Sequence, residues 1–557
     1  MIKYPENYNP ILEYWEQISK EIACDKIRRT YKKIVSDLSN QREYFYSPER
    51  ANHIIEFVEN FCRHSKGKMG GKKIALELWE KAMLATIFGF VDIDGNRKYR
   101  EAVLIVGKKN GKSLLSSAVG LYLLVADGEA GPEVVSVASK RDQAKIIWLE
   151  SRRMVRKSPT LSARIKTLVA EMDSDFNDGV FKPLASDSDT LDGLNIHGGM
   201  MDEIHAWKNG KALYDIIADG TSAREQPLIF ITTTAGTVRE DIYDMKYDEA
   251  ERVINGYGEK GYKDEHFIAF IYELDNRKEW TDPACWKKAN PGLGTIKNLK
   301  TLTAKVEKAK ANPALVKNLL CKEFNIRETT SEAWLTFEQL NNTATFDIKT
   351  LKPRYGIIGI DLSSTTDLTC ATLLFKVKDD ETIYLKQMYW LPSDLIEQRT
   401  KEDKIPYQTW FEMGLMRTSD GNKVNYKDVT AWCREVQGEM DCYIYKIGYD
   451  SWGATYLIDE LQQMFGKEST EAVIQGAKTF SGPLARFAAD LSGKKINYNN
   501  NPIFKWNLSN AAIAVDRNAN MALVKTSNPR KRIDGVASAM DAYIVFERNC
   551  ENYMNMI

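Results

Sequence analysis

Three short segments in the first half of the chain hold residue types that can bind and hydrolyse a nucleoside triphosphate. The first is Gly111-Lys112-Ser113, between an apolar run and a helical stretch. In such a loop, backbone N–H groups hold phosphates, the lysine reaches the β- and γ-phosphate oxygens, and the serine hydroxyl binds Mg²⁺. Val106 stands where the usual G-x-x-x-x-G-K-[ST] pattern has its first glycine. We predict a phosphate-binding loop here, with a lysine-rich surface turn as the alternative.

The second segment is an acidic pair, Asp202-Glu203, which ends the apolar run 195–201 about ninety residues after Lys112. At the carboxyl edge of a parallel sheet, where ligands bind, both side chains would face the nucleotide. We expect Asp202 to hold Mg²⁺, and Glu203 to orient and deprotonate the attacking water. The alternative for such a pair is a solvated turn.

The third segment is the β-branched run 227–236, which contains Thr232-Thr233-Thr234. Hydroxyl groups at a strand end beside the γ-phosphate can sense hydrolysis and pass the change on to the rest of the protein. Taken alone, this segment is more typical of an ordinary strand followed by a turn. Together with the loop and the acidic pair, it makes nucleotide hydrolysis the best-supported activity.

Aspartates in the last third of the chain have the pattern of a second, metal-dependent site. Asp361 follows the apolar run 356–360, and Asp450 follows 445–449. Cleavage of a phosphodiester by two metal ions about 4 Å apart needs several carboxylates from different elements. The alternative for either residue is a turn or a helix N-cap. We predict that both hold metal.

The third acid of this site is expected on the last helix, which contains both Asp534 and Asp541. Seven helical residues span about 10 Å, so one metal pair is not expected to use both. Asp534 is slightly favoured because it stands where the helix would start, and Asp541 is kept as a candidate. Asp367 is more typical of a turn or of a residue behind the metal ligands.

The elements that must position these residues suggest two α/β domains in series. Short β-rich runs alternate with helical stretches, which indicates parallel sheets covered by helices. We predict four ranges, namely an N-terminal helical segment (1–70), an ATPase domain (71–260), an intermediate subdomain with a linker (261–350) and a nuclease domain (351–557).

The amino-acid composition excludes a disordered or fibrous chain. The 557 residues are 43% hydrophobic and 28% charged, which is ordinary for a folded multidomain chain. Lysine plus arginine and aspartate plus glutamate are 77 each, so nucleic-acid binding must come from a local patch. The candidate patch lies just before the last helix and consists of Lys525, Arg530, Lys531 and Arg532. A solvated charged face is an equal alternative for it.

The eight cysteines contain no C-x-x-C pair, so neither a zinc site nor a disulfide framework is expected. The first residues lack the basic and apolar regions of a signal peptide, and the apolar stretch 114–126 is too short to span a bilayer. We therefore expect a cytoplasmic protein without a membrane partner.

Four segments in this order resemble the large terminase subunit of tailed bacteriophages: GKKNGKS, MMDEIHAW, SAREQPLIFITTTAG and ANPGLG. The resemblance covers roughly residues 70–545. It implies an ASCE-type P-loop NTPase domain followed by an RNase H-like nuclease domain. It also implies that ATP hydrolysis drives double-stranded DNA into a procapsid, and that an Mg²⁺- or Mn²⁺-dependent endonuclease cuts the concatemer. The implied partners are a small terminase subunit and the portal protein, on which a homo-oligomeric ring assembles in the host cytoplasm.

The resemblance also implies further nucleotide contacts. Leu78-Trp79-Glu80 takes the place of an aromatic–glutamine adenine motif, so Trp79 would stack on adenine, although Glu80 replaces the glutamine. An arginine would complete a neighbour's site, with Arg224 and Arg141 as candidates. The predicted nucleotide-binding set is Trp79, Lys108, Lys109, Asn110, Gly111, Lys112, Ser113, Asp202, Arg224 and Thr234.

Two other functions are weighed against this one. A helicase- or repair-type ATPase with an appended nuclease would need arginine-rich motifs after the third segment, and the sequence has none. A non-enzymatic scaffold would leave clustered carboxylates without a metal, which costs stability.

Overall fold

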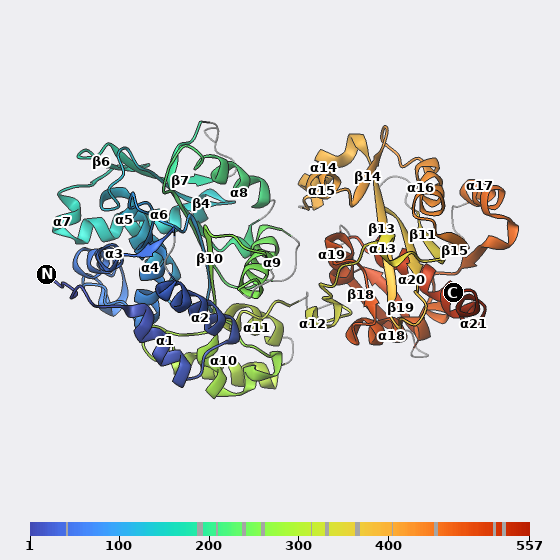
Figure 1. The fold of residues 1–557 in the computed structure, drawn as a ribbon, viewed down its shortest axis with the longest axis horizontal. Coiled ribbons are helices and arrows are strands. Elements are labelled where there is room, and N and C mark those ends of the chain that lie inside the picture. Colours follow the sequence, from blue (N-terminus) through green and yellow to red (C-terminus); the bar gives the residue numbers. More distant parts are fainter. Residues whose placement is uncertain are drawn as a thin grey trace. The chain divides into compact units, whose positions relative to one another are not determined.

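The computed structural model describes the chain except residues 41–42, 186–192, 208–209, 237–240, 258–261, 313–314, 329–332, 363–367, 404, 451–454, 516–519 and 526–530. Two compact units are present (Figure 1). The first comprises Met1–Thr237 with Asp241–Arg327, and the second continues from Glu328 to Ile557.

The first unit is built on a sheet that has eight strands within the described residues, in the order β10-β3-β9-β8-β4-β7-β6-β5. The six strands from β10 to β7 are parallel to their neighbours, and β6 and β5 are antiparallel. Their near-continuous apolar runs are what a sheet buried on both faces requires. The strands are β3 (Glu101–Ile105), β4 (Glu133–Ala138), β5 (Lys166–Thr167), β6 (Met172–Ser174), β7 (Gly179–Ala185), β8 (Ile196–Asp202), β9 (Leu228–Thr233) and β10 (Phe267–Ile271).

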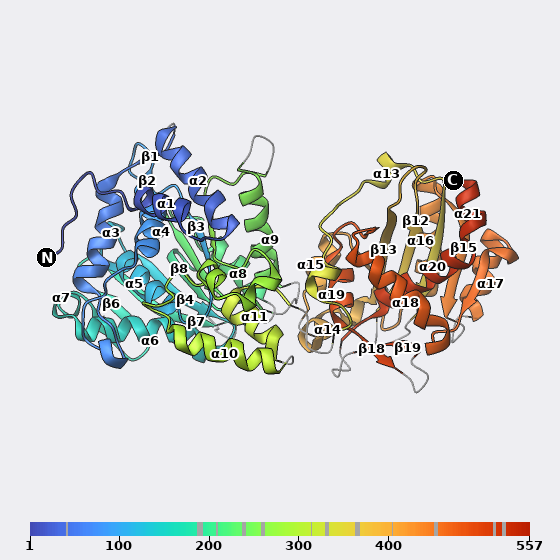
Figure 2. The ribbon, with the colours of Figure 1, turned by 90° about the horizontal axis from the view of Figure 1, so that it is seen from below.

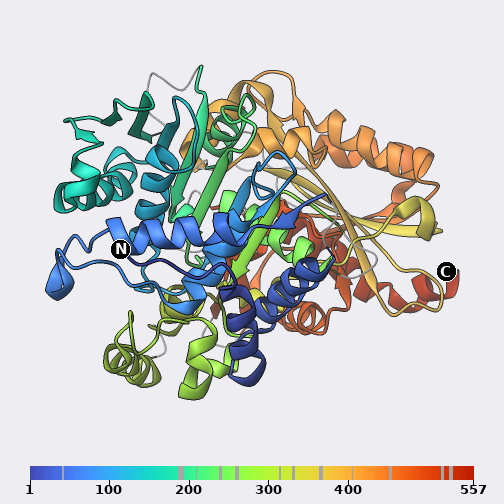
Figure 3. The ribbon, with the colours of Figure 1, turned by 60° about the vertical axis from the view of Figure 1, so that its left-hand side comes forward.

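Helices cover both faces of this sheet. Side chains of the N-terminal helices share one hydrophobic core with one sheet face, and a second core fills the other face. Helices α3 and α4 lie side by side (Figure 2), and α2 contacts β10 at the sheet edge. Figure 3 shows the blue N-terminal helices in front of green strands of the sheet. The helices are α1 (Pro10–Lys20), α2 (Asp25–Ser39), α3 (Pro48–Phe61), α4 (Leu78–Gly89), α5 (Lys112–Val125), α6 (Arg141–Lys157), α7 (Pro159–Ser162), α8 (Gly210–Asp219) and α9 (Ile242–Asn255).

In the same unit, the described residues of 274–324 form a small layer with a hydrophobic core of its own, in which Trp286, Leu302 and Phe324 are buried together. The layer contains α10 (Leu299–Ala311) and α11 (Val316–Phe324). The described residues of 1–70 and 261–327 therefore belong to the same unit as the eight-stranded sheet rather than to separate units.

The second unit contains a mixed sheet of the order β14-β13-β12-β11-β15-β16, with β17 paired to β13. An antiparallel hairpin, β11–β12, is continued by the parallel partner β15. The strands are β11 (Tyr355–Asp361), β12 (Thr369–Phe375), β13 (Ile383–Pro392), β14 (Met416–Ser419), β15 (Tyr443–Asp450), β16 (Thr470–Val473) and β17 (Ile496–Asn497). The predicted succession of a parallel-sheet domain and a second α/β domain is confirmed.

Helices again cover the two faces of this sheet. One core includes the apolar sides of α18, α19 and α20, and another includes those of α16 and α17. Beside them lies a separate hairpin of β18 (Ala511–Val515) and β19 (Met521–Lys525). The helices are α12 (Phe337–Leu340), α13 (Ile348–Leu351), α14 (Ile396–Asp403), α15 (Tyr407–Glu412), α16 (Tyr426–Glu439), α17 (Thr455–Phe465), α18 (Ala477–Ser492), α19 (Pro502–Asn510), α20 (Asp534–Arg548) and α21 (Cys550–Met556). In the described part of the chain, no helix has the length and apolar character needed to cross a bilayer.

Candidate active sites

The predicted phosphate-binding loop joins β3 to α5 and wraps around Lys112. Lys109 and Gly111 have φ of 70° and 86°, the left-handed region in which glycine is least strained. Lys112 is the first residue of α5 and is only 6% exposed. Its Nζ donates to the carbonyl of Val106 at 3.1 Å. The lysine thus lies inside the loop, where a helix N-terminus favours negative charge.

The acidic pair lies beside this loop because β3, β9 and β8 are parallel neighbours, and all three end at the same edge of the sheet. Asp202 is in register with Thr232. Ser113 Oγ donates to Asp202 Oδ2 at 2.9 Å, and Thr232 Oγ1 donates to Asp202 Oδ1 at 2.9 Å. Burial and the charge of Glu203 raise the pKa of Asp202, and Lys112 opposes this. The three predicted segments therefore meet at one carboxylate.

Glu203 directly follows β8 and has φ of 52°, a strained value for a residue with a side chain. Its Oε1 lies 3.7 Å from Lys112 Nζ, and its Oε2 lies 3.0 Å from His205 Nδ1. Burial would raise the pKa of Glu203, but the hydrogen bond with His205 and the charge of Lys112 lower it to about 2. The carboxylate is therefore ionised and faces the lysine.

The other loop residues are held by the motif at 289–294. Asn110 Nδ2 donates to the carbonyl of Gly107 at 2.7 Å and to Asn290 Oδ1 at 2.9 Å. A Cβ on Gly107 would lie 2.3 Å from Asn290 Oδ1, so only glycine fits there. Lys108 donates its backbone N–H to the carbonyl of Lys322 at 2.8 Å. Asn110 thus shapes the loop, and the charge of Lys108 acts on Glu203.

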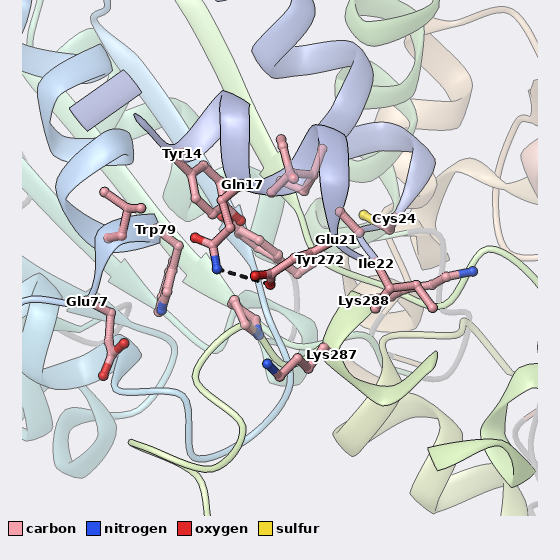
Figure 4. A pocket seen from close by; sticks show the side chains of 15 residues that line it. Tyr14, Gln17, Glu21, Ile22, Cys24, Glu77, Trp79, Tyr272, Lys287 and Lys288 are labelled. Atoms are coloured by element: carbon pink, nitrogen blue, oxygen red, sulfur yellow. Dashed lines mark hydrogen bonds between the residues drawn. The ribbon is translucent and has the colours of Figure 1, made fainter. Parts of the chain in front are cut away.

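Trp79 lies against a cavity of about 140 Å³ near the loop (Figure 4). The indole is 3% exposed and makes an edge contact with the Tyr272 ring, with centroids 5.5 Å apart. Gln17 of α1 faces the same cavity and donates Nε2 to Glu21 Oε2 at 3.2 Å. The cavity also reaches Pro291, the neighbour of Asn290. It offers an aromatic wall and an amide within one pocket.

Glu80, the residue that departs from the expected glutamine, lies on α4 and is buried facing the loop. Its Oε2 accepts from the backbone N–H of Glu77 at 2.9 Å, and its Oε1 lies 3.5 Å from where a Cβ of Gly111 would be. Burial raises the pKa of Glu80 to about 8. At neutral pH the carboxyl is therefore protonated, so it can donate and accept a hydrogen bond as glutamine does.

This raised pKa makes stability depend on pH. The unfolded chain ionises Glu80 near pH 4.5 and the folded chain near pH 8, so the fold loses stability as pH rises through that window. Glu80→Gln stays neutral and keeps the acceptor for Glu77. We expect its unfolding midpoint to exceed that of the unmodified chain by several degrees at about pH 8, and to match it at about pH 4.5. Differential scanning calorimetry at both pH values measures these midpoints, with a variant of the exposed Glu13, Glu13→Gln, as control. If the difference in midpoint between Glu80→Gln and the unmodified chain is the same at both pH values, the prediction is wrong.

The structure does not bring Arg224 to the other predicted residues. Arg224 precedes β9 and thus lies at the amino edge of the sheet, whereas the loop and Asp202 lie at the carboxyl edge. Its Nη1 pairs with Glu129 at 2.8 Å and its Nη2 donates to the carbonyl of Gly131 at 2.8 Å. Arg141 begins α6 after β4, beside the end of β8, and is exposed.

In the second unit, Asp361 and Asp534 line one cavity of about 260 Å³, together with Gln475 and Lys525. Asp361 ends β11 and Asp450 ends β15. Ile360 pairs with Tyr449, so the two aspartates lie next to each other. These three predicted metal ligands therefore gather at one end of the sheet.

Two glycines place α20 against these strands. A Cβ on Gly359 would lie 2.1 Å from the carbonyl of Ser538, and one on Gly448 would lie 2.7 Å from that of Asp541. Each glycine stands two residues before an aspartate of the site. The close approach of helix and sheet is what brings Asp534 to the strand ends.

Asp541 is fully buried and does not line the cavity of Asp361 and Asp534. Its Oδ2 accepts from Gln475 Nε2 at 3.1 Å. Burial and the charge of Asp450 hold its pKa well above the usual range. The cavity therefore favours Asp534. Asp367 and Arg530 lie outside the described residues.

The donor set of the second site consists of carboxylate oxygens, which suit Mg²⁺. Within the described ranges, no three acidic, histidine or cysteine side chains converge closely enough to hold a metal ion by themselves. Asp361 and Asp534 line one cavity, and Asp450 lies next to Asp361.

Family models match both halves of the chain. The terminase large subunit ATPase domain matches residues 78–252, and the endonuclease domain of the same subunit matches residues 261–549. The chain belongs to the terminase large subunit family. Its similarity to the terminase large subunit of Enterobacteria phage HK97 is 25% identity over 88% of this chain and 94% of that one. The terminase large subunit of Lactococcus phage p2 is 22% identical over 96% of this chain and 97% of that one.

Solved structures include the crystal structure of the HK97 large terminase, at 23% identity and a TM-score of 0.49, covering 89% of this chain and 99% of that one. Another is the large terminase of the thermophilic phage D6E, at 10% identity and a TM-score of 0.30, covering 82% and 95%.

As a terminase large subunit, the protein is an ATPase and a DNA endonuclease of viral DNA packaging, and the helicase- or repair-type alternative is not favoured. ATP is the substrate of its first domain. The sequence alone did not single out His205, which lies beside Glu203, or Gln17, which lines the cavity of Trp79. His205 was detectable as the second residue after the acidic pair, whereas Gln17 reaches the cavity of Trp79 only through the packing of α1.

Proposed function

We propose that ATP binds with its phosphates on residues 107–113 and its adenine in the cavity beside Trp79. The observation that carries this proposal is that, at the carboxyl edge of the sheet, Ser113 contacts Asp202 and Lys112 faces Glu203. Ser113 and Asp202 would hold Mg²⁺, which neutralises charge on the phosphates when bound. Lys112 would turn from Glu203 to the β- and γ-phosphates.

Glu203 would then orient the attacking water and accept its proton. A triphosphate adds negative charge next to this carboxylate and takes Lys112 from it, and both changes raise the pKa of Glu203 toward that of a useful base. Thr232 and Thr234 reach Asp202 and Glu203, so their strand is suited to sense the loss of the γ-phosphate.

For the adenine, the Trp79 wall supplies stacking surface and the Gln17 amide supplies a donor and an acceptor for the base edge. Glu80 would not read the base. It is turned toward Gly111 and supports the loop as a neutral group.

In the second unit we propose that Asp361, Asp450 and Asp534 bind Mg²⁺ or Mn²⁺, which activates water and stabilises the leaving oxygen of DNA. Lys525 lines the same cavity, so it is placed to contact a phosphate of the backbone. Asp541, held by Gln475, would support Asp450 without touching metal.

The family function extends this to an assembly. We propose that several copies form a ring on the portal protein, receive double-stranded DNA with the help of a small terminase subunit, and act in the host cytoplasm. Arg141 is the arginine best placed to reach a neighbour's ATP, because it is exposed at the same sheet edge as Asp202.

A mixing experiment tests this ring. We expect Arg141→Ala to lower the rate of ATP hydrolysis by the DNA-bound assembly at least about 30-fold. An arginine that completes a neighbour's ATP site contributes about 10³-fold or more to kcat. Adding subunits with Lys112→Ala, which keep Arg141 but lack the phosphate lysine, should restore part of the activity. Absence of restoration would contradict action between subunits.

Arg224→Ala is the matched control for that experiment. Loss of the pair with Glu129 should lower thermal stability, because a half-buried carboxylate loses its arginine partner. The hydrolysis rate per folded subunit should stay unchanged. Loss of hydrolysis without loss of stability would instead return Arg224 to the site.

A further inference from the structure

His205 occupies a short turn, Ile204–Ala206, that directly follows Glu203. The turn is tied to the neighbouring strand, because the backbone N–H of Glu203 donates to the carbonyl of Thr232 at 2.8 Å. The imidazole Nδ1 lies 3.0 Å from Glu203 Oε2 and 3.0 Å from Thr233 Oγ1. The ring therefore lies between the proposed base and the strand that carries the threonines.

The direction of these hydrogen bonds follows from counting protons. The Thr233 hydroxyl has one hydrogen, and it donates this hydrogen to the carbonyl of Thr234 at 3.0 Å. Thr233 Oγ1 also accepts the backbone N–H of His205 at 3.3 Å. The Glu203 carboxylate faces Lys112 and can only accept a hydrogen bond, and the Thr233 hydrogen is used elsewhere. Nδ1 of His205 therefore carries the hydrogen and shares it between Glu203 Oε2 and Thr233 Oγ1.

The site is built to hold this ring. The His205 side chain is 15% exposed. A Cβ on Gly236 would lie 3.1 Å from the His205 Cβ, so glycine at this position leaves the histidine its space. Glu203 has two strong partners among the described residues, His205 on Oε2 and Lys112 on Oε1, and Thr234 Oγ1 stands at 3.5 Å.

We propose that His205 is the positioning residue of ATP hydrolysis. When a triphosphate draws Lys112 away, the Nδ1–H of His205 keeps the Glu203 carboxylate aimed at the attacking water. Through Thr233, the same ring links the orientation of the base to the position of the β9 end. This inference rests on the proposed role of Glu203 as the base.

Three substitutions test the inference in the full-length chain. His205→Ala removes the donor, His205→Asn places an amide nitrogen near the position of Nδ1, and His205→Gln places it near Nε2. A misplacement of about 1 Å at a catalytic group costs up to about 10²-fold, so we expect His205→Ala to lower kcat for ATP about 30-fold. The KM should change less than about threefold, because the phosphate contacts remain.

The conservative variant should recover the rate and the displaced amide should not. We expect kcat of His205→Asn to lie within about fivefold of the unmodified chain and kcat of His205→Gln to resemble that of His205→Ala. If His205→Ala fails to fold, the comparison of kcat between His205→Asn and His205→Gln is sufficient to test the proposal. Equal rates for Asn and Gln, or a loss confined to KM, would overturn the proposal.

The link to β9 has its own readout. In a double-mutant cycle, His205→Ala combined with Thr233→Val should lower kcat much less than the product of the single losses, since both act through one contact. Multiplicative losses would overturn the link. Glu203→Gln separates the two proposals. If it retains hydrolysis, the proposed base is wrong, whereas if it loses hydrolysis and His205→Ala does not, only the role of His205 is wrong.

Discussion

Replacing Asp361 with alanine is expected to abolish cleavage of plasmid DNA and to leave ATP hydrolysis unchanged. Asp361 shares its cavity with Asp534 and lies next to Asp450, so its loss removes a ligand from the proposed metal site. Metal-dependent hydrolysis then falls by about 10³-fold or more, because the activated water is lost. The residues of the proposed ATP site belong to the first unit, whereas Asp361 belongs to the second.

Gel assays of plasmid cutting with Mg²⁺ or Mn²⁺, run beside a phosphate-release assay, measure both activities. Asp459→Ala is the matched control, since Asp459 is an exposed aspartate on α17 of the same unit. Asp541→Asn should affect stability more than metal affinity, because this carboxyl is buried against Gln475. Cutting that survives in Asp361→Ala would refute the assignment of the nuclease site.

Replacing Glu203 with glutamine is expected to lower the kcat of ATP hydrolysis by about 10³-fold, within the range that a positioned acid–base group contributes. The amide keeps the size of the side chain and its contact with His205, but it cannot accept a proton from water. ATP binding should persist or become tighter, because a negative charge next to Lys112 is removed.

Fluorescent nucleotide titration and phosphate release separate these two effects. Glu225→Gln is the control, an exposed glutamate near the start of β9 at the opposite sheet edge. A variant that loses ATP binding together with hydrolysis would mean that Glu203 holds the site together rather than acting on water.

Much of this architecture is local in the sequence and was predictable. Apolar runs that end in polar residues define strands, and parallel strands deliver their ends to one edge. The family and the two-domain fold are therefore confirmed. The residue roles remain predictions, although the structure does bring Ser113, Asp202 and Thr232 into direct contact.

Residues whose role depends on the side of the sheet were harder to assign. Arg224 precedes its strand, so it was bound to lie at the amino edge, away from a ligand at the carboxyl edge. The run 267–271 is apolar enough for a strand, but nothing local indicates that it adds β10 beside β3. Gln17 lies far from Trp79 in sequence, and only tertiary packing of α1 joins them.

Other features were present in the sequence but carried a meaning that only packing reveals. Gly359 and Gly448 each precede an aspartate by two residues, which is readable as a pattern. Its cause, the contact of α20 with both strands, requires the fold. The choice between Asp534 and Asp541 is of the same kind, because helical spacing alone leaves both open and the cavity separates them.

The most direct test of the central claim is a crystal structure of the Glu203→Gln variant grown with ATP and Mg²⁺. We predict the γ-phosphate within hydrogen-bonding distance of Lys112 Nζ, the metal ion between Ser113 and Asp202, and the adenine against Trp79. A nucleotide bound elsewhere, or Lys112 still directed at Val106 with ATP present, would contradict the account.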